Sequence, residues 1–212
     1  MGGYRYKIGK NIGFDKYGIP QIATSKLFQF SQEYIENYLP YTIELGRSFV
    51  RMELVKAQGV RKSIFALDNL WDGLGSLILR HPEIKYFMGK VTMYANYNAL
   101  ARDYILFFLN KHFADKKSLI TPIYQLGYKT DISKFAQIFN FETFKDDYTV
   151  LSKNVRLLGE VIPPLINSYM NLSPSMKTFG TSINKDFGEV EETGIMITID
   201  DIYDSKKRRH LS

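Results

Sequence analysis

A carboxylate and a guanidinium, Glu44 and Arg47, lie close together in the apolar, β-rich segment Tyr41 to Val50. Charged side chains in such a strand are costly to bury unless they are paired or face a solvated cleft. Glu44 could therefore act as a general base for an amine, and Arg47 could hold a carboxylate or a phosphate bidentately. A structural ion pair explains the pattern equally well. The two side chains lie on opposite faces of a regular strand, unless a bulge near Gly46 intervenes.

A glycine-containing basic loop precedes a strongly amphipathic segment, Ser63 to Arg80, which predicts a helix. A helix N-terminus presents unpaired N–H groups and the positive end of the helix dipole, so it suits a phosphate. An ordinary capped helix is the more frequent explanation of this spacing alone. The candidate donor-binding residues of the loop are Gln58, Gly59, Val60, Arg61, Lys62 and Ser63.

A third candidate position follows the strand predicted over 85–94. Ligand sites of open α/β sheets lie beyond the carboxyl ends of the strands. Tyr94 and Asn96 could contact an acyl thioester there, and Tyr94 could protonate a leaving thiolate. Asn98 is better explained as the N-cap of the next helix.

The acidic stretch Asp186 to Gly194 lacks the ligand spacing of a calcium loop, so we expect a solvated acidic turn and no metal site. The three histidines are far apart in the sequence. The chain has no cysteine, which excludes thiolate zinc sites, disulfides and a cysteine nucleophile.

Composition narrows the class of protein further. The 212 residues are 45% hydrophobic, and the net charge is +6. A basic surface favours acidic partners. The sequence has no recognisable nucleic-acid-binding module, so we expect no nucleic acid among these partners. The basic tail Lys206 to Arg209 predicts a frayed, solvated terminus. We find no signal-peptide pattern and no membrane-length apolar run, and we expect a cytoplasmic protein.

Hydrophobic periodicity predicts a mostly parallel α/β sheet with right-handed crossovers. We divide the chain into a core half (1–115), a second half of the same domain with a helical insertion and late strands (116–204), and a basic tail (205–212). The last strand has little alternation and is expected to be buried on both faces. Strands are predicted over 4–9, 41–50, 85–94, 176–183 and 194–199, and helices over 27–38, 63–80, 98–113, 132–139, 144–157 and 165–171.

Several motifs together resemble the ornithine-lipid-type N-acyltransferases, GNAT-fold proteins often called hemolysins. Lys90-Val91-Thr92-Met93-Tyr94 and Phe179-Gly180-Thr181 are similar to the glycine-lipid and N-acylglycine synthases of the Bacteroidetes branch. The Glu-Leu-Gly-Arg strand is also similar to one in acyl-homoserine-lactone synthases. The other matching segments are Gly3-Tyr4-Arg5, Glu44 to Val50, Leu70-Trp71-Asp72-Gly73, Ile162 to Met170 and Asp186-Phe187-Gly188.

The resemblance implies a GNAT-like mixed central sheet flanked by helices, here lacking the family's N-terminal elements. It implies transfer of a 3-hydroxy fatty acyl chain from acyl carrier protein to the amine of glycine or another small amino acid. Glu44 would help to remove the amine proton, and Arg47 and Arg5 would orient the carboxylate or stabilise charge. The thioester of acyl carrier protein or coenzyme A is the donor, and no tightly bound cofactor is expected.

Two other function classes stay open. A non-catalytic protein that binds lipid or the anionic inner face of the membrane would fit the basic tail. An acetyl-coenzyme A-dependent N-acetyltransferase is the third hypothesis.

Overall fold

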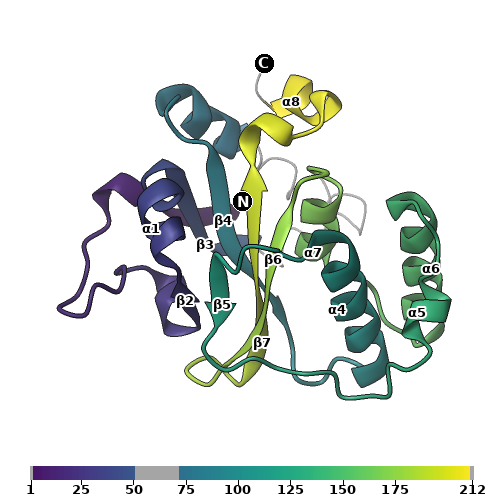
Figure 1. The fold of residues 1–212 in the computed structure, drawn as a ribbon. Helices are drawn as coiled ribbons and strands as arrows, with labels where there is room; N and C mark the ends of the chain where they lie inside the picture. The colour runs from purple at the N-terminus through teal and green to yellow at the C-terminus, as the bar shows by residue number, and fades with distance from the viewer. Residues whose placement is uncertain (1, 51–71, 211–212) are drawn as a thin grey trace.

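The computed structural model describes residues 2–50 and 72–210. Its centre is a five-stranded sheet in the order β1-β3-β4-β7-β6, and β2 and β5 form a separate pair in front of it (Figure 1). The strands are β1 (Gly2–Ile8), β2 (Phe28–Phe30), β3 (Thr42–Val50), β4 (Tyr86–Met93), β5 (Ile120–Pro122), β6 (Lys177–Asn184) and β7 (Val190–Thr198).

Helices from the N-terminal and the C-terminal parts of the chain pack around this sheet, and α4 to α7 lie beside β6 (Figure 1). The short 3-10 helices are η1 (Gly9–Asn11), η2 (Ala23–Lys26), η3 (Leu39–Tyr41) and η4 (Ile199–Asp201). The α-helices are α1 (Gln32–Asn37), an unlabelled helix over 72–80, α4 (Ala99–Phe113), α5 (Phe135–Ile138), α6 (Phe144–Leu157), α7 (Pro164–Met170) and α8 (Asp204–His210).

The sheet is mixed. β3 and β4 are parallel, and the β1–β3, β4–β7 and β6–β7 pairs are antiparallel. The GNAT-like mixed sheet flanked by helices is thus confirmed, whereas the expectation of mostly parallel pairing is wrong. The late strands β6 and β7 form a hairpin, which needs no crossover helix between them.

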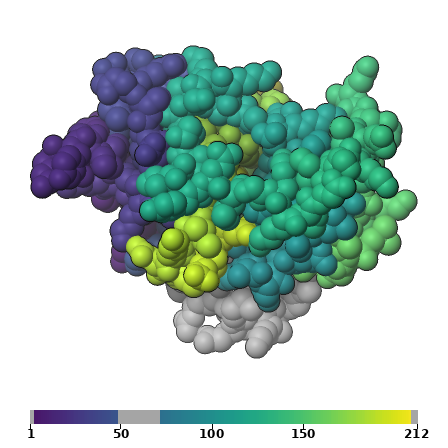
Figure 2. Space-filling model, turned by 60° about the horizontal axis from the view of Figure 1, so that its bottom comes forward, coloured from purple at the N-terminus to yellow at the C-terminus, as the bar shows by residue number. Residues whose placement is uncertain are grey.

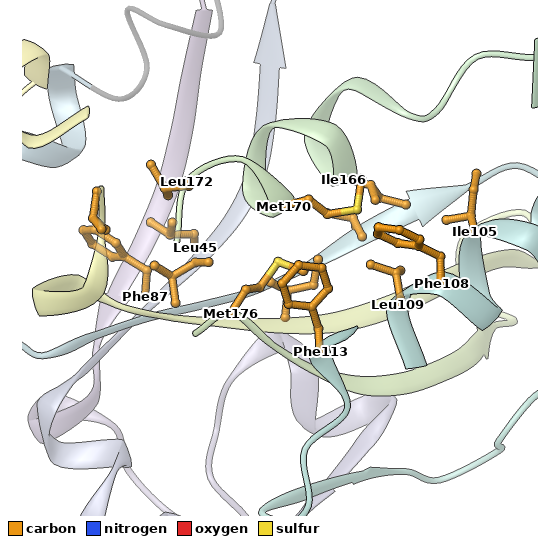
Figure 3. Close-up of a cluster of buried hydrophobic side chains, with 14 of the residues drawn as sticks. Leu45, Phe87, Ile105, Phe108, Leu109, Phe113, Ile166, Met170, Leu172 and Met176 are labelled. Carbon is orange, nitrogen blue, oxygen red and sulfur yellow. The ribbon is translucent and has the colours of Figure 1, made fainter. Parts of the chain in front are cut away.

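Each face of the sheet has its own apolar core. On one face, side chains of β3, β4 and β7 pack against α4, α6, α7 and the helix over 72–80, as Figure 3 shows for Leu45, Phe87, Phe108 and Met170. We call this the α4 face. On the other face, Met88 and Met196 pack under β2, α1 and β5. We call this the β2 face. β7 is buried on both faces, as predicted.

The sequence predicted a single helix over 27–38, but the structure has a strand and then a shorter helix there. Phe28 is buried in β2, and the helix begins only after Ser31, whose hydroxyl accepts a hydrogen bond from Tyr34 N at 3.1 Å. A serine cap inside an apolar run starts a helix at that residue. The basic tail also differs from expectation, because α8 is helical to His210 instead of frayed.

Candidate functional site

The two parallel strands separate part-way along their length. β3 and β4 pair only at Thr42–Tyr86, Ile43–Phe87 and Glu44–Met88, although β3 continues to Val50 and β4 to Met93. Beyond Glu44, the facing edges of these two strands therefore form no backbone hydrogen bonds with each other. Such unpaired edges offer backbone N–H and C=O groups to an extended ligand.

Glu44 stands at the last of these pairs, on the β2 face, and its side chain is buried. Its Oε1 accepts hydrogen bonds from Thr24 N at 2.9 Å and from Thr24 Oγ1 at 2.8 Å. Its Oε2 accepts one longer bond, from Ala23 N at 3.3 Å. Glu44 thus holds the N-terminus of η2 against the sheet, and Oε2 keeps lone pairs for a further donor.

Arg47 lies in a β-bulge next to Gly46. Arg5 of β1 pairs with Gly46, and Gly3 pairs with Phe49, so Arg47 and Ser48 together oppose a single residue of β1. Arg47 has φ = 53°, a left-handed conformation rare for a residue with a side chain, and it is exposed. The strand is thus irregular near Gly46, which is the alternative that the sequence left open.

Arg5 lies on the β2 face. It is two residues from Lys7, which pairs with Glu44, and alternate residues of a strand share a face. Arg5 is exposed beside Gly46, where a Cβ would meet no atom within 4 Å. The structure therefore brings Arg5 and Glu44 to one face of neighbouring strands, next to an open position.

Tyr94 and Asn96 are exposed in the turn that follows β4, where Tyr97 N donates to Tyr94 O at 3.0 Å. Asn98 caps α4 as predicted, because its Oδ1 accepts from Leu100 N at 3.0 Å and Ala101 N at 3.2 Å. Tyr94 and Asn96 are thus free to meet a ligand, and the roles assigned to them stay predictions.

The predicted donor loop, residues 58–63, lies outside the described residues. The helix that follows it is described over 72–80, and its Leu74 and Leu77 pack on the α4 face with Leu45. Glu44 points to the opposite face.

The expectation of a solvated acidic turn over 186–194 is only partly correct. Asp186 and Glu189 are exposed in the β6–β7 turn, as expected, but Glu191 and Glu192 are buried in β7. Alternating positions of a strand face opposite sides. Because Glu-Glu offers no alternation of polarity, the sequence alone did not reveal that each carboxylate has a basic partner, Glu191 in Arg102 of α4 and Glu192 in Lys90 of β4.

Glu192 lies on the β2 face. Its Oε1 accepts from Lys90 Nζ at 2.5 Å and Asn184 Nδ2 at 3.1 Å, and its Oε2 accepts from Thr92 Oγ1 at 2.9 Å. Only 2% of the Glu192 side chain is exposed, against 22% for Lys90. Lys90 and Thr92 belong to the part of β4 that does not pair with β3, so this cluster lies beside the end of the β3–β4 pairing.

Glu191 lies on the α4 face. Its Oε2 accepts from Arg102 Nε at 2.7 Å, and its Oε1 lies 2.8 Å from Lys129 Nζ. Arg102 also bonds Asp103 Oδ1 at 2.6 Å and Gly127 O at 2.7 Å. Asp103 is itself held by Thr130. This network fastens α4 to β7 and to the loop after β5.

A pocket of about 210 Å³ adjoins this network at the β6 edge. Figure 2 shows a hollow framed by teal segments, with yellow-green C-terminal strands at its floor. The lining combines α4, the loop after β5 and the two C-terminal strands, and includes Leu106, Asn110, Tyr128, Thr181 and Thr193. The pocket lies across the sheet from Arg5 and Glu44.

The chain is similar to two glycine N(alpha)-acyltransferases. One is from Phocaeicola vulgatus and the other from Bacteroides thetaiotaomicron, and each is 52% identical to this chain over 211 residues. The matches cover 100% of this chain but 65% and 63% of the two relatives. No family model and no solved structure matches the chain.

Two further features are absent from residues 2–50 and 72–210. No group of three His, Asp or Glu side chains there could hold a metal ion. Within the same residues, no helix has the length and hydrophobicity needed to cross a bilayer.

Proposed function

We propose that this chain takes part in transfer of a fatty acyl chain from a thioester to the amine of glycine or another small amino acid. The observation that carries the proposal is the 52% identity to two glycine N(alpha)-acyltransferases along the whole chain. The separated strands β3 and β4, with polar side chains beside the opening, support it.

The chemistry requires a neutral amine and a stabilised leaving thiolate. The amine loses a proton, its nitrogen forms a C–N bond with the thioester carbonyl carbon, and the C–S bond breaks. The sulfur takes up a proton, so one proton is released for each ammonium that reacts. Glu44 is the proposed proton acceptor, through the lone pairs left on Oε2.

The other predicted residues surround this path. Arg47 and Arg5 are proposed to orient the substrate carboxylate or to stabilise charge. Tyr94 and Asn96, exposed after β4, are proposed to contact the thioester, with Tyr94 as the proton donor to sulfur. The donor arm would enter at Gln58, Gly59, Val60, Arg61, Lys62 and Ser63 and pass between β3 and β4.

We propose acyl carrier protein as the donor, with a 3-hydroxyacyl chain. An acidic carrier complements a chain of net charge +6. The loop 58–63 contains one glycine, Gly59. Loops that bind a pyrophosphate are usually richer in glycine, so the sequence of this loop favours coenzyme A less than a carrier protein. The products would be N-acyl amino acids or the aminolipids made from them, formed by a protein that contacts the membrane peripherally.

A donor and acceptor panel tests the proposal. The protein is incubated with 3-hydroxyacyl carrier protein, long-chain acyl-coenzyme A or acetyl-coenzyme A, each with several amino acids, and products are identified by mass spectrometry. We expect N-acylglycine from the carrier-protein donor. Product from acetyl-coenzyme A alone would establish an acetyltransferase instead. Absence of any N-acyl product, together with pelleting on anionic liposomes, would favour a lipid-binding protein.

A further inference from the structure

A loop over 13–20, between η1 and η2, projects from the side of the protein. Figures 1 and 2 both show it in purple at the left edge of the molecule. Its large apolar side chains Phe14, Tyr17 and Ile19 are 46%, 75% and 46% exposed. Exposed apolar side chains that are grouped together commonly mark an interaction surface, whereas single ones do not. We call residues 13–20 the apolar loop.

The apolar loop has a defined backbone. Phe14 and Pro20 form an antiparallel bridge at its base. Asp15 Oδ1 accepts hydrogen bonds from Tyr17 N at 2.8 Å and from Ile19 N at 2.9 Å. Asp15 N in turn donates to Ile19 O at 3.0 Å. The loop therefore satisfies much of its own backbone, which lowers the cost of moving its tip out of water.

The chain around the apolar loop is basic. Residues 2–30 contain one carboxylate, that of Asp15, and five basic side chains, those of Arg5, Lys7, Lys10, Lys16 and Lys26. Their net charge of +4 is most of the +6 of the whole chain. Two of the lysines pair with acidic side chains of other segments, which leaves a positive balance. Lys16 lies at the tip itself, where its Nζ is 4.9 Å from the centre of the Tyr17 ring.

A lipid bilayer fits these features better than a protein partner does. A stable protein interface takes about 20 to 30 residues from each side, which is more than one short projecting loop offers. Lipid head groups close around a convex tip, and the membrane–water interface favours aromatic side chains with a polar end, such as tyrosine. Anionic lipids also attract lysine and arginine side chains.

We infer that the apolar loop is the surface by which this protein contacts the head-group region of an anionic bilayer. Its three apolar side chains insert between the head groups, and Lys16 lies near the lipid phosphates. The loop leads into η2, which Glu44 holds against the sheet. This contact therefore places lipid on the side of the protein that carries the proposed proton acceptor. The inference rests on the proposed function, whose acylated product belongs in a bilayer.

Partition onto vesicles tests the inference. The protein is centrifuged with phosphatidylcholine vesicles that contain or lack phosphatidylglycerol, and the bound fraction gives a partition coefficient. We expect Tyr17→Ser to lower the coefficient for the anionic vesicles about 5- to 20-fold, because an inserted aromatic side chain is lost. Lys16→Gln should lower it about fivefold and leave binding to phosphatidylcholine alone unchanged. Both side chains are exposed, so neither change should alter the fold.

Leu157→Ser is the matched control. Leu157 is 73% exposed, nearly as much as Tyr17, but it ends α6, which Figure 1 shows on the other side of the sheet. This variant should bind vesicles as the unaltered protein does. Equal losses in Leu157→Ser and Tyr17→Ser would indicate general adhesion and overturn the inference. So would unchanged binding in Tyr17→Ser, or no binding of the unaltered protein to the anionic vesicles.

Two further measurements separate this inference from the alternatives. Light scattering reports self-association, and a dimer lost in Tyr17→Ser while vesicle binding is unchanged would assign the loop to contact between two copies and overturn the inference. N-acylglycine formation without vesicles should be retained in Tyr17→Ser. If the unaltered protein acylates no amino acid, the proposed function fails, and the partition coefficients alone decide whether the loop contacts lipid.

Discussion

Glu191 and Glu192 are neighbours on β7, yet they join opposite layers of the protein. Glu191 Oε2 lies 2.7 Å from Arg102 Nε of α4, whereas Glu192 Oε2 lies 2.9 Å from Thr92 Oγ1 on the β2 face. The first carboxylate is shared with a network that fastens a helix. The second accepts hydrogen bonds from Lys90 and Thr92 of β4. The same residue type therefore holds a helix on one face of the sheet and a neighbouring strand on the other.

The Arg102 network predicts a large loss of stability when its cation is removed. Arg102→Met would leave the carboxylates of Asp103 and Glu191 buried without the guanidinium. We expect the free energy of unfolding to fall by about 3–5 kcal/mol, the usual effect of removing one partner of a buried pair. Urea denaturation followed by circular dichroism measures this change.

An exposed ion pair provides the control for Arg102. Lys26 and Asp186 lie 3.0 Å apart, but 75% and 73% of their side chains are exposed. Lys26→Met should therefore lower the free energy of unfolding by no more than about 1 kcal/mol. A loss of similar size in both variants would contradict the structural role given to Arg102.

Asp147 predicts how stability depends on pH. Burial raises the pKa of its carboxyl, but hydrogen bonds from Lys111, His112 and Phe141 N together hold that pKa below its ordinary value. A depressed pKa in the folded state contributes stability above the unfolded value, about pH 4, and loses it as the pH falls further. The free energy of unfolding should therefore decrease as the pH is lowered below about 4.

Asp147→Asn checks this assignment. The variant cannot ionise at this position, so it should be less stable at neutral pH and show a weaker decline in acid. Urea titrations at pH 3, 4, 5 and 7 on both proteins give the comparison. If the free energy of unfolding fell equally with decreasing pH in both proteins, other carboxyl groups would be responsible for the loss of stability in acid.

Gly9 is predicted to be intolerant of any side chain. A Cβ there would lie 1.6 Å from Leu39 O, so the backbone of η1 or η3 would have to move. We expect Gly9→Ala to lower the free energy of unfolding by about 1–3 kcal/mol, as overpacking does. Gly127→Ala is the control, since its Cβ would meet no atom within 4 Å. Equal melting temperatures for the two variants would refute the predicted clash.

Local signals predicted the elements near the candidate site well. Asn98 and the apolar spacing after it predicted α4, and Thr143 caps α6 at its predicted start, Phe144. The pairing of strands is not encoded locally, so the antiparallel place of β7 between β4 and β6 was missed. Nothing in the sequence indicated that Thr24 is a hydrogen-bond partner of Glu44. Thr24 lies 20 residues away along the chain, in a segment that folds over the β2 face.

Glu44 and Thr24 separate a proton-transfer role from a structural one. Thr24→Val removes the hydroxyl that donates to Glu44 Oε1 at 2.8 Å but leaves the carboxylate, whereas Glu44→Gln removes the proton acceptor. Each change should lower the free energy of unfolding by about 1–3 kcal/mol, because buried polar atoms lose a partner.

Their effects on catalysis should differ. If Glu44 takes the amine proton, Glu44→Gln lowers kcat about 10²- to 10⁴-fold at saturating substrates, and Thr24→Val changes kcat only a few fold. Equal and modest kcat losses in both would make Glu44 an anchor for η2 alone, and the proton would then have to leave through water or another side chain on the β2 face.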